Sequence, residues 1–135
     1  MKRVFVDSNV PMYVAGRAHP NREPARRFLD DLRAGEIEAC TSTEVLQEIL
    51  YRYAGLKRLD LAAQVYELFV QLCPLVFAVN LADTDRAKEL VCGKARASPR
   101  DALHAAVMLN NDVEVIATFD GDFDRIPGVR RMKLI

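Results

Sequence analysis

The chain has 135 residues, of which 50% are apolar and 28% are charged, and its 19 basic and 19 acidic residues give a formal net charge of zero. These values are ordinary for a soluble globular domain that is long enough to bury a core, and no apolar run approaches the ~20 residues that span a bilayer. The balanced charge excludes a global basic field for nucleic acid, although it leaves room for local basic clusters.

Apolar residues recur along the chain with the periods of alternating strands and helices. The first predicted strand ends in Asp7-Ser8-Asn9, a turn-forming sequence. Strands separated by helices indicate an α/β domain with a mainly parallel sheet. In chain order we predict a strand at 3–7, helices at 10–15 and 23–34, a strand at 37–40, helices at 41–55 and 59–72, a strand at 75–79, helices at 82–92 and 98–111, and strands at 113–118 and 132–135.

Two features bear on the compartment in which the protein works. Asp7 interrupts the short apolar run at the N-terminus, which is not typical of a signal peptide, so we expect a cytoplasmic protein. The cysteines Cys40, Cys73 and Cys92 are widely spaced and form neither a CxxC pair nor a zinc pattern. We interpret all three as reduced thiols that are packed rather than reactive.

Acidic residues follow two of the predicted strands. Asp7 comes directly after the first strand, and Asp120 comes just after the strand at 113–118. In a parallel sheet the carboxyl ends of the strands meet at one edge, and ligands bind beyond that edge. Helix N-termini point toward the same edge, so we expect Asp101, near the start of the helix at 98–111, to lie there as well.

Asp7 and Asp101 each have a structural explanation that competes with a functional one. Asp7 fits a turn residue or the N-cap of the next helix. Asp101 fits the third position of a capping box that begins at Ser98, with Pro99 at the first helical position. His104 follows three residues later, and an isolated helical histidine is more often a structural hydrogen-bonding residue than a ligand.

Two glutamates lie four residues apart on the helix at 41–55. Glu44 fits a capping box in which Thr41 is the N-cap. Glu48 lies one turn further into the helix, outside any capping motif. Its structural explanation is an ion pair with Arg52 at i+4, and its functional explanation is a role as a metal ligand.

The last acidic cluster, TFDGDFDR, contains Asp120, Asp122 and Asp124. It lacks a glycine and a terminal glutamate at the spacing of an EF-hand calcium loop, which argues against that motif. Several carboxylates gathered at one sheet edge repel one another unless cations neutralise them. Oxygen ligands suit Mg²⁺ or Mn²⁺, and a pair of such ions ~4 Å apart is a common arrangement for phosphodiester hydrolysis.

Four segments carry a resemblance to a known family. They are VFVDSNV at 4–10, TSTEVLQEIL at 41–50, SPRDALHAA at 98–106 and IATFDGDFDRIPGV at 116–129. In order and spacing they resemble the PIN-domain ribonucleases and, within them, the VapC-type toxins of toxin–antitoxin pairs. The resemblance implies one three-layer PIN-like nuclease domain over residues 1–135, with a central, mainly parallel sheet flanked by helices.

The resemblance also implies a site and an activity. The protein would be a metal-dependent endoribonuclease that hydrolyses RNA phosphodiester bonds to a 5′ phosphate and a 3′ hydroxyl. It would pair with itself and with a separate antitoxin. Its acidic site would bind Mg²⁺ or Mn²⁺ and consist of Asp7, Glu48, Asp101 and Asp120, with Asp122 as an alternative or auxiliary metal ligand and Ser8 and Asn9 as supporting residues. Candidate RNA phosphate contacts are Arg17, Arg22, Arg26 and Arg100.

Rival interpretations stay open at the level of the sequence. A haloacid-dehalogenase-type phosphatase also places an aspartate after its first strand, but it needs a second one two residues later, where this chain has Asn9. A PIN scaffold that binds RNA or a protein partner without cutting is the second rival. The presence of all four acids argues against it. An RNA-processing nuclease without a toxin role would use the same chemistry.

Overall fold

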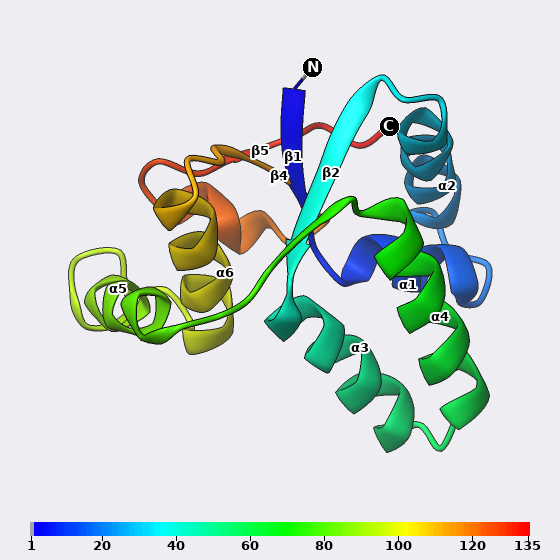
Figure 1. Ribbon diagram of the computed structural model, residues 1–135, viewed down its shortest axis with the longest axis horizontal. Helices are drawn as coiled ribbons and strands as arrows, with labels where there is room; N and C mark the ends of the chain where they lie inside the picture. Colours follow the sequence, from blue (N-terminus) through cyan, green and yellow to red (C-terminus); the bar gives the residue numbers. More distant parts are fainter. Residues whose placement is uncertain (1) are drawn as a thin grey trace.

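Five parallel strands form the centre of the computed structural model, which describes residues 2–135 (Figure 1). Every neighbouring pair of strands is parallel. The prediction of an α/β fold with a mainly parallel sheet is therefore confirmed. Across the sheet the strands are β3 (Leu75–Phe77), β2 (Ile37–Ser42), β1 (Lys2–Val6), β4 (Val115–Ala117) and β5 (Arg130–Arg131).

Helices cover both faces of the sheet and complete the three predicted layers. In Figure 1, α1, α2 and α4 lie on one side of the sheet, α5, α6 and η1 lie on the other, and α3 packs beside α4. Within residues 2–135, none of the helices combines the length and the apolar character that a membrane span requires. The helices are α1 (Asn9–Ala15), α2 (Arg22–Arg33), α3 (Thr43–Gly55), α4 (Leu59–Leu72), α5 (Leu81–Cys92), α6 (Pro99–Asn110) and the 3-10 helix η1 (Gly121–Arg125).

The strand order reverses direction beside β1. The chain moves outward from β1 to β2 and β3, and then crosses back so that β4 pairs with the other side of β1. The ends of β1 and β4 mark this switch point, and open α/β sheets bind ligands in the crevice outside the carboxyl ends of such strands. The backbone N–H of Asp7 donates to the carbonyl of Ala117 at 3.1 Å, so these two strands end at the same level.

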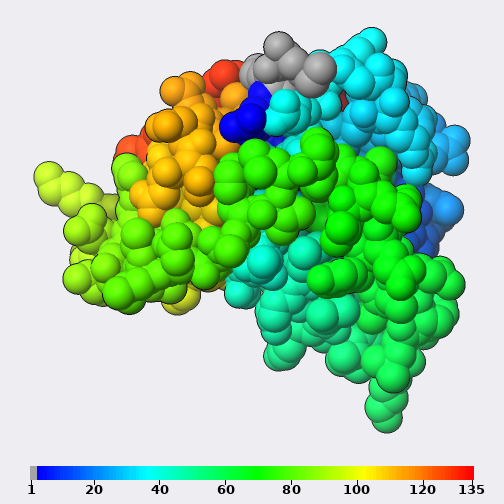
Figure 2. Space-filling view, in the orientation of Figure 1, coloured from blue at the N-terminus to red at the C-terminus, as the bar shows by residue number. Residues whose placement is uncertain are grey.

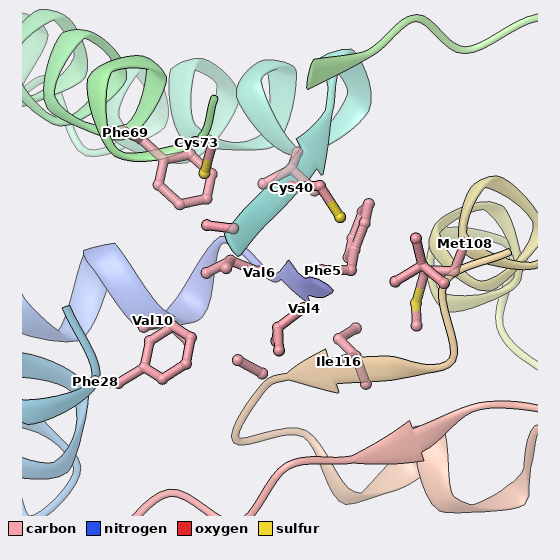
Figure 3. Close-up of a cluster of buried hydrophobic side chains, with 14 of the residues drawn as sticks. Val4, Phe5, Val6, Val10, Phe28, Cys40, Phe69, Cys73, Met108 and Ile116 are labelled. Carbon is pink, nitrogen blue, oxygen red and sulfur yellow. The ribbon is translucent and has the colours of Figure 1, made fainter. Parts of the chain in front are cut away.

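Packing on both faces explains the continuous apolar run of β1. Residues 4–6 are fully buried, as expected for a central parallel strand covered on both sides. Figure 3 shows Phe5 directed toward Met108 of α6, while Phe28 of α2 lies on the opposite side of the strand. The rings of Phe5 and His104 are 5.9 Å apart between centroids. The core therefore also places His104 of α6 beside β1.

The predicted capping box at Thr41 and Glu44 is wrong. β2 continues to Ser42, and the Oγ of Ser42 accepts a hydrogen bond from the N–H of Val45 at 3.3 Å as the N-cap of α3. Thr41 stays in the strand, where its hydroxyl donates to the carbonyl of Val6 at 3.1 Å. Pairing with β1 thus keeps Thr41 in the sheet and leaves Glu44 without a capping role.

The predicted strand at 132–135 is also wrong. The last strand is β5, which pairs with β4 at the edge of the sheet and consists of two arginines. The N–H of Met132 donates to the carbonyl of Ile116 at 2.8 Å, and the residues after it are not strand. Charged residues are common on edge strands, so the apolar residues of the tail do not mark the paired segment.

The three cysteines differ in their surroundings. Cys40 and Cys73 are buried, as predicted, and Cys92 at the end of α5 is exposed. The expectation of a packed thiol is therefore wrong for Cys92.

Candidate metal centre

Asp7 lies directly beyond the carboxyl end of β1, where β1 and β4 end side by side, and hydrogen bonds hold both of its carboxylate oxygens. The residue is only 6% exposed. Its Oδ1 accepts a hydrogen bond from the backbone N–H of Ser8 at 2.7 Å, and its Oδ2 accepts one from the hydroxyl of Thr118 at 2.8 Å. The local fold therefore fixes the orientation of this carboxylate.

Thr118 connects three parts of the site, although no sequence motif singled it out. Besides donating to Asp7, its Oγ1 accepts from Asn9 Nδ2 at 3.0 Å and from the backbone N–H of Asp120 at 3.1 Å. Asn9 in turn accepts from the N–H of Phe119 at 3.3 Å through its Oδ1. The only sequence signal for Thr118 was a hydroxyl at the end of an apolar strand.

Glu48 of α3 meets His104 of α6 across the crevice. Nε2 of His104 lies 2.5 Å from Oε1 of Glu48 and 3.9 Å from Oδ1 of Asp7. Nδ1 of the fully buried histidine has no hydrogen-bond partner within residues 2–135. Burial alone would lower the pKa of His104. The hydrogen bond to Glu48 and the charges of Asp7, Glu48 and Asp101 outweigh it and raise that pKa.

The predicted ion pair between Glu48 and Arg52 is absent from the described residues. Instead, Nε of Arg100 lies 3.3 Å from Oε2 of Glu48. Because the two oxygens of Glu48 face different partners, His104 on one side and Arg100 on the other, its carboxylate is part of the crevice rather than of a solvated helix face.

Asp101 opens α6 as predicted. The Oγ of Ser98 accepts from the N–H of Asp101 at 3.3 Å, and Pro99 is the first residue of the helix. The reciprocal half of a capping box is missing, because Oδ1 of Asp101 is buried and finds no hydrogen-bond partner in the described part of the chain. Burial, together with the negative charges of Asp120 and Asp7, raises the pKa of Asp101.

Asp120 and Asp122 follow β4 at the rim of the crevice. Asp120 is half-buried, and its Oδ1 accepts from the N–H of Asp122 at 2.9 Å. The side chain of Asp122 is 65% exposed and lies 3.5 Å from Arg125. Asp120 therefore sits deeper in the site, and Asp122 closes its outer side.

The six ligand-bearing side chains form two adjoining groups. In each group, one ligand atom per residue lies within 4.8 Å of the others. The guanidinium of Arg100 lies between the two groups. Its Nε is 3.3 Å from Oε2 of Glu48 and 3.8 Å from Oδ1 of Asp101, and its Nη2 is 3.9 Å from Oδ2 of Asp120. One group is Asp7, Glu48 and His104, and the other is Asp101, Asp120 and Asp122.

The donor set fits a hard divalent cation. Five of the six side chains are carboxylates, which Mg²⁺ and Mn²⁺ prefer over nitrogen and sulfur ligands. A cation beside Asp101 would give a partner to its unpaired buried oxygen and would offset the repulsion that raises its pKa. The arrangement can therefore hold a divalent ion at the sheet edge.

The four arginines predicted to contact RNA phosphates fall in two regions. Arg100 lies among the acids. Arg17, Arg22 and Arg26 belong to the connection after α1 and to α2, where Arg26 pairs with Glu23 at 3.7 Å. Among the described ion pairs, none joins Arg17 or Arg22 to the acidic cluster.

A groove borders the acids on one side. Its volume is about 300 Å³, and Glu48 and Arg100 form the part of its wall next to the candidate metal ligands. A molecule that binds along α3 would therefore reach the acidic cluster through this groove.

Comparison with known proteins places the chain in a family. The family model for the PIN domain matches residues 4–129. The chain is 35% identical over 129 residues to ribonuclease VapC13 of Mycobacterium tuberculosis, which covers 96% of this chain and 98% of the relative. It is 37% identical over 120 residues to ribonuclease VapC23 of the same species, with 87% and 92% covered.

Solved structures of toxin and toxin–antitoxin proteins share the fold. VapC20 of Mycobacterium tuberculosis, described as a Sarcin-Ricin loop cleaving toxin, matches with a TM-score of 0.72 at 22% identity over 90% of this chain and 92% of that chain. VapBC2 from Rickettsia felis, bound to a DNA fragment from its promoter, matches with a TM-score of 0.72 at 16% identity over 96% and 97%. The chain therefore belongs to the PIN domain family, as a relative of the VapC ribonucleases.

Proposed function

We propose that this chain is a metal-dependent endoribonuclease that hydrolyses RNA phosphodiester bonds as the toxin of a type II toxin–antitoxin pair. Family membership and two relatives named ribonucleases at 35% and 37% identity support this proposal. The observation that carries it is the convergence of four acids at the carboxyl edge of the sheet, one of which keeps a buried oxygen without a hydrogen-bond partner. The four proposed catalytic acids are Asp7, Glu48, Asp101 and Asp120.

The proposed cofactor is Mg²⁺ or Mn²⁺. Asp7 and Asp101 would hold the principal ion, with Asp120 and Asp122 completing the site from the rim. When bound, the ion would lower the pKa of an attacking water to about 7 and stabilise the charge on the leaving oxygen. Thr118 and Ser8 support this role because they fix both oxygens of Asp7 before any ion arrives.

Other residues of the site orient the substrate. His104 holds Oε1 of Glu48, and Oε2, which faces Arg100 at 3.3 Å, would orient the attacking water at the edge of the groove. Arg100 is the proposed contact to the scissile phosphate, and Arg17, Arg22 and Arg26 are proposed contacts to the RNA on either side. The water oxygen bonds to phosphorus, the bond from phosphorus to the 3′ oxygen breaks, and that oxygen takes up a proton. The products are a 5′ phosphate and a 3′ hydroxyl.

We propose that the protein is cytoplasmic and that residues 1–135 fold as one domain. Solved structures with this fold include toxin–antitoxin complexes from Klebsiella pneumoniae, Salmonella typhimurium and Haemophilus influenzae. By analogy we propose that this chain forms a homodimer and binds a separate antitoxin protein.

A cleavage assay tests the enzymatic part of the proposal. Purified protein is incubated with labelled structured RNAs in the presence of Mn²⁺, Mg²⁺ or EDTA, beside the variants Asp7→Asn and Asp101→Asn. Asp30→Asn, an exposed residue of α2 that pairs with Arg33, is the matched control. We expect cleavage that requires metal, is lost in both site variants and persists in the control. Cleavage in EDTA or in Asp7→Asn would contradict the proposal, and binding without cleavage would favour a non-cutting scaffold.

A growth assay separates the toxin role from RNA processing. Expression of the wild-type chain in a bacterial host should arrest growth, and co-expression of its proposed antitoxin should restore it. Expression of Asp101→Asn should not arrest growth. Normal growth with active enzyme present would favour a processing nuclease that uses the same site.

A further inference from the structure

One side of α3 is lined by polar and aromatic side chains that the core does not use. Glu44, Gln47, Glu48, Tyr51 and Arg52 lie three or four residues apart, so they share one face of the helix. The opposite face is buried and consists of Val45, Leu46, Ile49 and Tyr53. Figure 2 shows α3 and α4 projecting from the body of the molecule. The polar face therefore runs outward from the acidic site.

This face is the floor of the groove that borders the acids. Ser8 at the N-cap of α1, Met12 of α1 and Arg100 of α6 also line it. The volume of about 300 Å³ lies at the lower end of the ~300–1,000 Å³ of small-ligand sites. Because Glu48 belongs both to the groove and to the acidic site, an occupant of the groove would lie beside the reacting phosphate.

Tyr51 has no structural role that explains its place in the groove. It is 76% exposed and has no side-chain hydrogen bond among the described residues. Single-stranded RNA is recognised by stacking unpaired bases on exposed aromatic rings. A tyrosine one turn beyond a catalytic glutamate is placed to receive the base adjacent to the scissile phosphate.

Two further side chains of this face carry hydrogen-bonding groups without partners in the described structure. Glu44 is half-buried and offers only acceptors, while Gln47 offers both a donor and an acceptor. Guanine presents two adjacent donors, N1–H and the N2 amino group, beside the O6 acceptor. A carboxylate can accept both donors in a bidentate contact, and a glutamine amide can donate to O6.

Two arginines line the groove and can contact phosphates on either side of a base. Arg100 lies at the end next to the acids and Arg52 lies further along α3, so a phosphate on each side of the base would meet a guanidinium. The floor between them is aromatic and polar. These are the contacts that a flanking nucleotide requires.

We propose that the groove along α3 is the subsite for the nucleotide next to the scissile phosphate, with Tyr51 stacking on its base and Glu44 and Gln47 selecting guanine. This inference rests on the proposed ribonuclease function. Glu44 and Gln47 are thus specificity residues, and Tyr51 is a substrate-binding residue outside the metal centre.

The test uses a random-sequence, single-stranded RNA pool cut by the full chain with Mn²⁺, followed by sequencing of the new ends. The wild type should enrich guanine at one position beside the cut. Glu44→Gln should lose that enrichment while it still cuts the pool. Tyr51→Ala should cut about ten- to a hundredfold more slowly at low RNA concentration, the loss expected for one stacked base, with a raised KM. Tyr51→Phe keeps the ring and should recover most of the rate and KM lost in Tyr51→Ala.

Leu50→Ala provides a matched control on the same helix, because Leu50 is exposed but does not line the groove. It should keep both rate and sequence preference. Cleavage with unchanged rate and preference in Tyr51→Ala and Glu44→Gln would overturn the inference and leave the ribonuclease function intact. The same result with weakened antitoxin binding in Tyr51→Ala would assign the groove to the antitoxin instead.

A second readout decides the inference if the wild type cuts no RNA. Side-chain NMR signals of Tyr51 are followed during titration with 5′-GMP and, separately, with 5′-UMP. A shift at lower concentrations of 5′-GMP supports the guanine subsite even though the cleavage function fails. Equal or absent shifts overturn it.

Discussion

Thr118 and Asp7 are 111 residues apart in the chain, and a hydrogen bond of 2.8 Å joins the threonine hydroxyl to Oδ2 of the aspartate. It spans the point where β1 and β4, neighbours in the sheet, end side by side. The same hydroxyl accepts from Asn9 and from the backbone of Asp120. One buried side chain therefore links the first acid of the site to the loop that carries the last.

Thr118→Val should damage both stability and activity. The isosteric valine removes the donor to Asp7 and leaves two donors without their acceptor, which costs about 1–3 kcal/mol of unfolding free energy. Activity should fall about 10- to 100-fold, as is typical when a residue that orients a metal ligand is lost. Thermal unfolding and initial cleavage rates measure the two effects. Thr118→Ser keeps the hydroxyl and should retain most activity, and equal loss in both variants would contradict this role.

Asp101→Asn should abolish cleavage but raise the melting temperature of the metal-free protein. The pKa of Asp101 is raised in the folded state by burial and by Asp120 and Asp7. The folded protein therefore gains stability from this group below its unfolded pKa of about 3.9. That gain is lost as pH rises through the folded pKa, so the charged form is unfavourable at pH 7.

Asparagine removes this charge without changing the size of the side chain. Scanning calorimetry in EDTA at pH 7 measures the difference, and adding Mn²⁺ should stabilise the wild type but not the variant. A lower melting temperature for Asp101→Asn in EDTA would contradict the prediction that the charge of Asp101 destabilises the metal-free protein. Stabilisation of both proteins by Mn²⁺ would place the ion elsewhere.

The pair formed by Glu48 and His104 predicts non-additive effects on stability. Glu48→Ala leaves the fully buried imidazole without its partner, which should cost about 1–3 kcal/mol of unfolding free energy. Replacing both residues with leucine should recover part of this loss, because no buried polar group is then left unpaired. Chemical denaturation of Glu48→Leu, His104→Leu and the double variant gives the coupling energy.

Glu44→Ala is the control for the pair. Glu44 lies on the same helix and has no described side-chain hydrogen bond, so its removal should change stability by no more than about 0.5 kcal/mol. An equal cost at Glu44 and Glu48 would show that the loss comes from α3 itself and not from the contact with His104.

Thiol labelling should distinguish the three cysteines. Burial raises the pKa of Cys40 and of Cys73 to about 12 each, whereas Cys92 is exposed. Because only the thiolate reacts, the folded protein at pH 8 should take up one label quickly, at Cys92, and all three in denaturant. Mass spectrometry counts the labels, with Cys92→Ser as the control. Rapid labelling of Cys40 or Cys73 would show that the core around β2 opens.

Local patterns were enough to predict most of the fold. The apolar run at residues 3–7 predicted a buried strand, and Ser98 with Pro99 predicted the start of α6. The predictions were wrong where strand pairing, rather than the local sequence, decides between two equally suitable residues. Thr41 and Ser42 are both suitable N-caps, and only the pairing of β2 with β1 shows that Ser42 is the one used.

The acids of the site were predictable for a topological reason, and their partners were not. Asp7 and Asp120 follow strands, and parallel strands bring such residues to one edge. The contact of His104 with Glu48 joins two helices 56 residues apart in the chain, and no spacing rule encodes it. Thr118 was hidden for the same reason, because its role depends on β4 lying beside β1.

The most direct test of the account measures Mn²⁺ binding and RNA cleavage on the same samples. Calorimetric titration gives the fraction of sites occupied, and the cleavage rate is recorded at each Mn²⁺ concentration for the wild type, Asp101→Asn and Asp30→Asn. We predict that the rate follows occupancy in the wild type and in Asp30→Asn, and that Asp101→Asn loses both. Wild-type Mn²⁺ binding in Asp101→Asn, or cleavage without bound metal, would contradict a catalytic metal centre at this edge of the sheet.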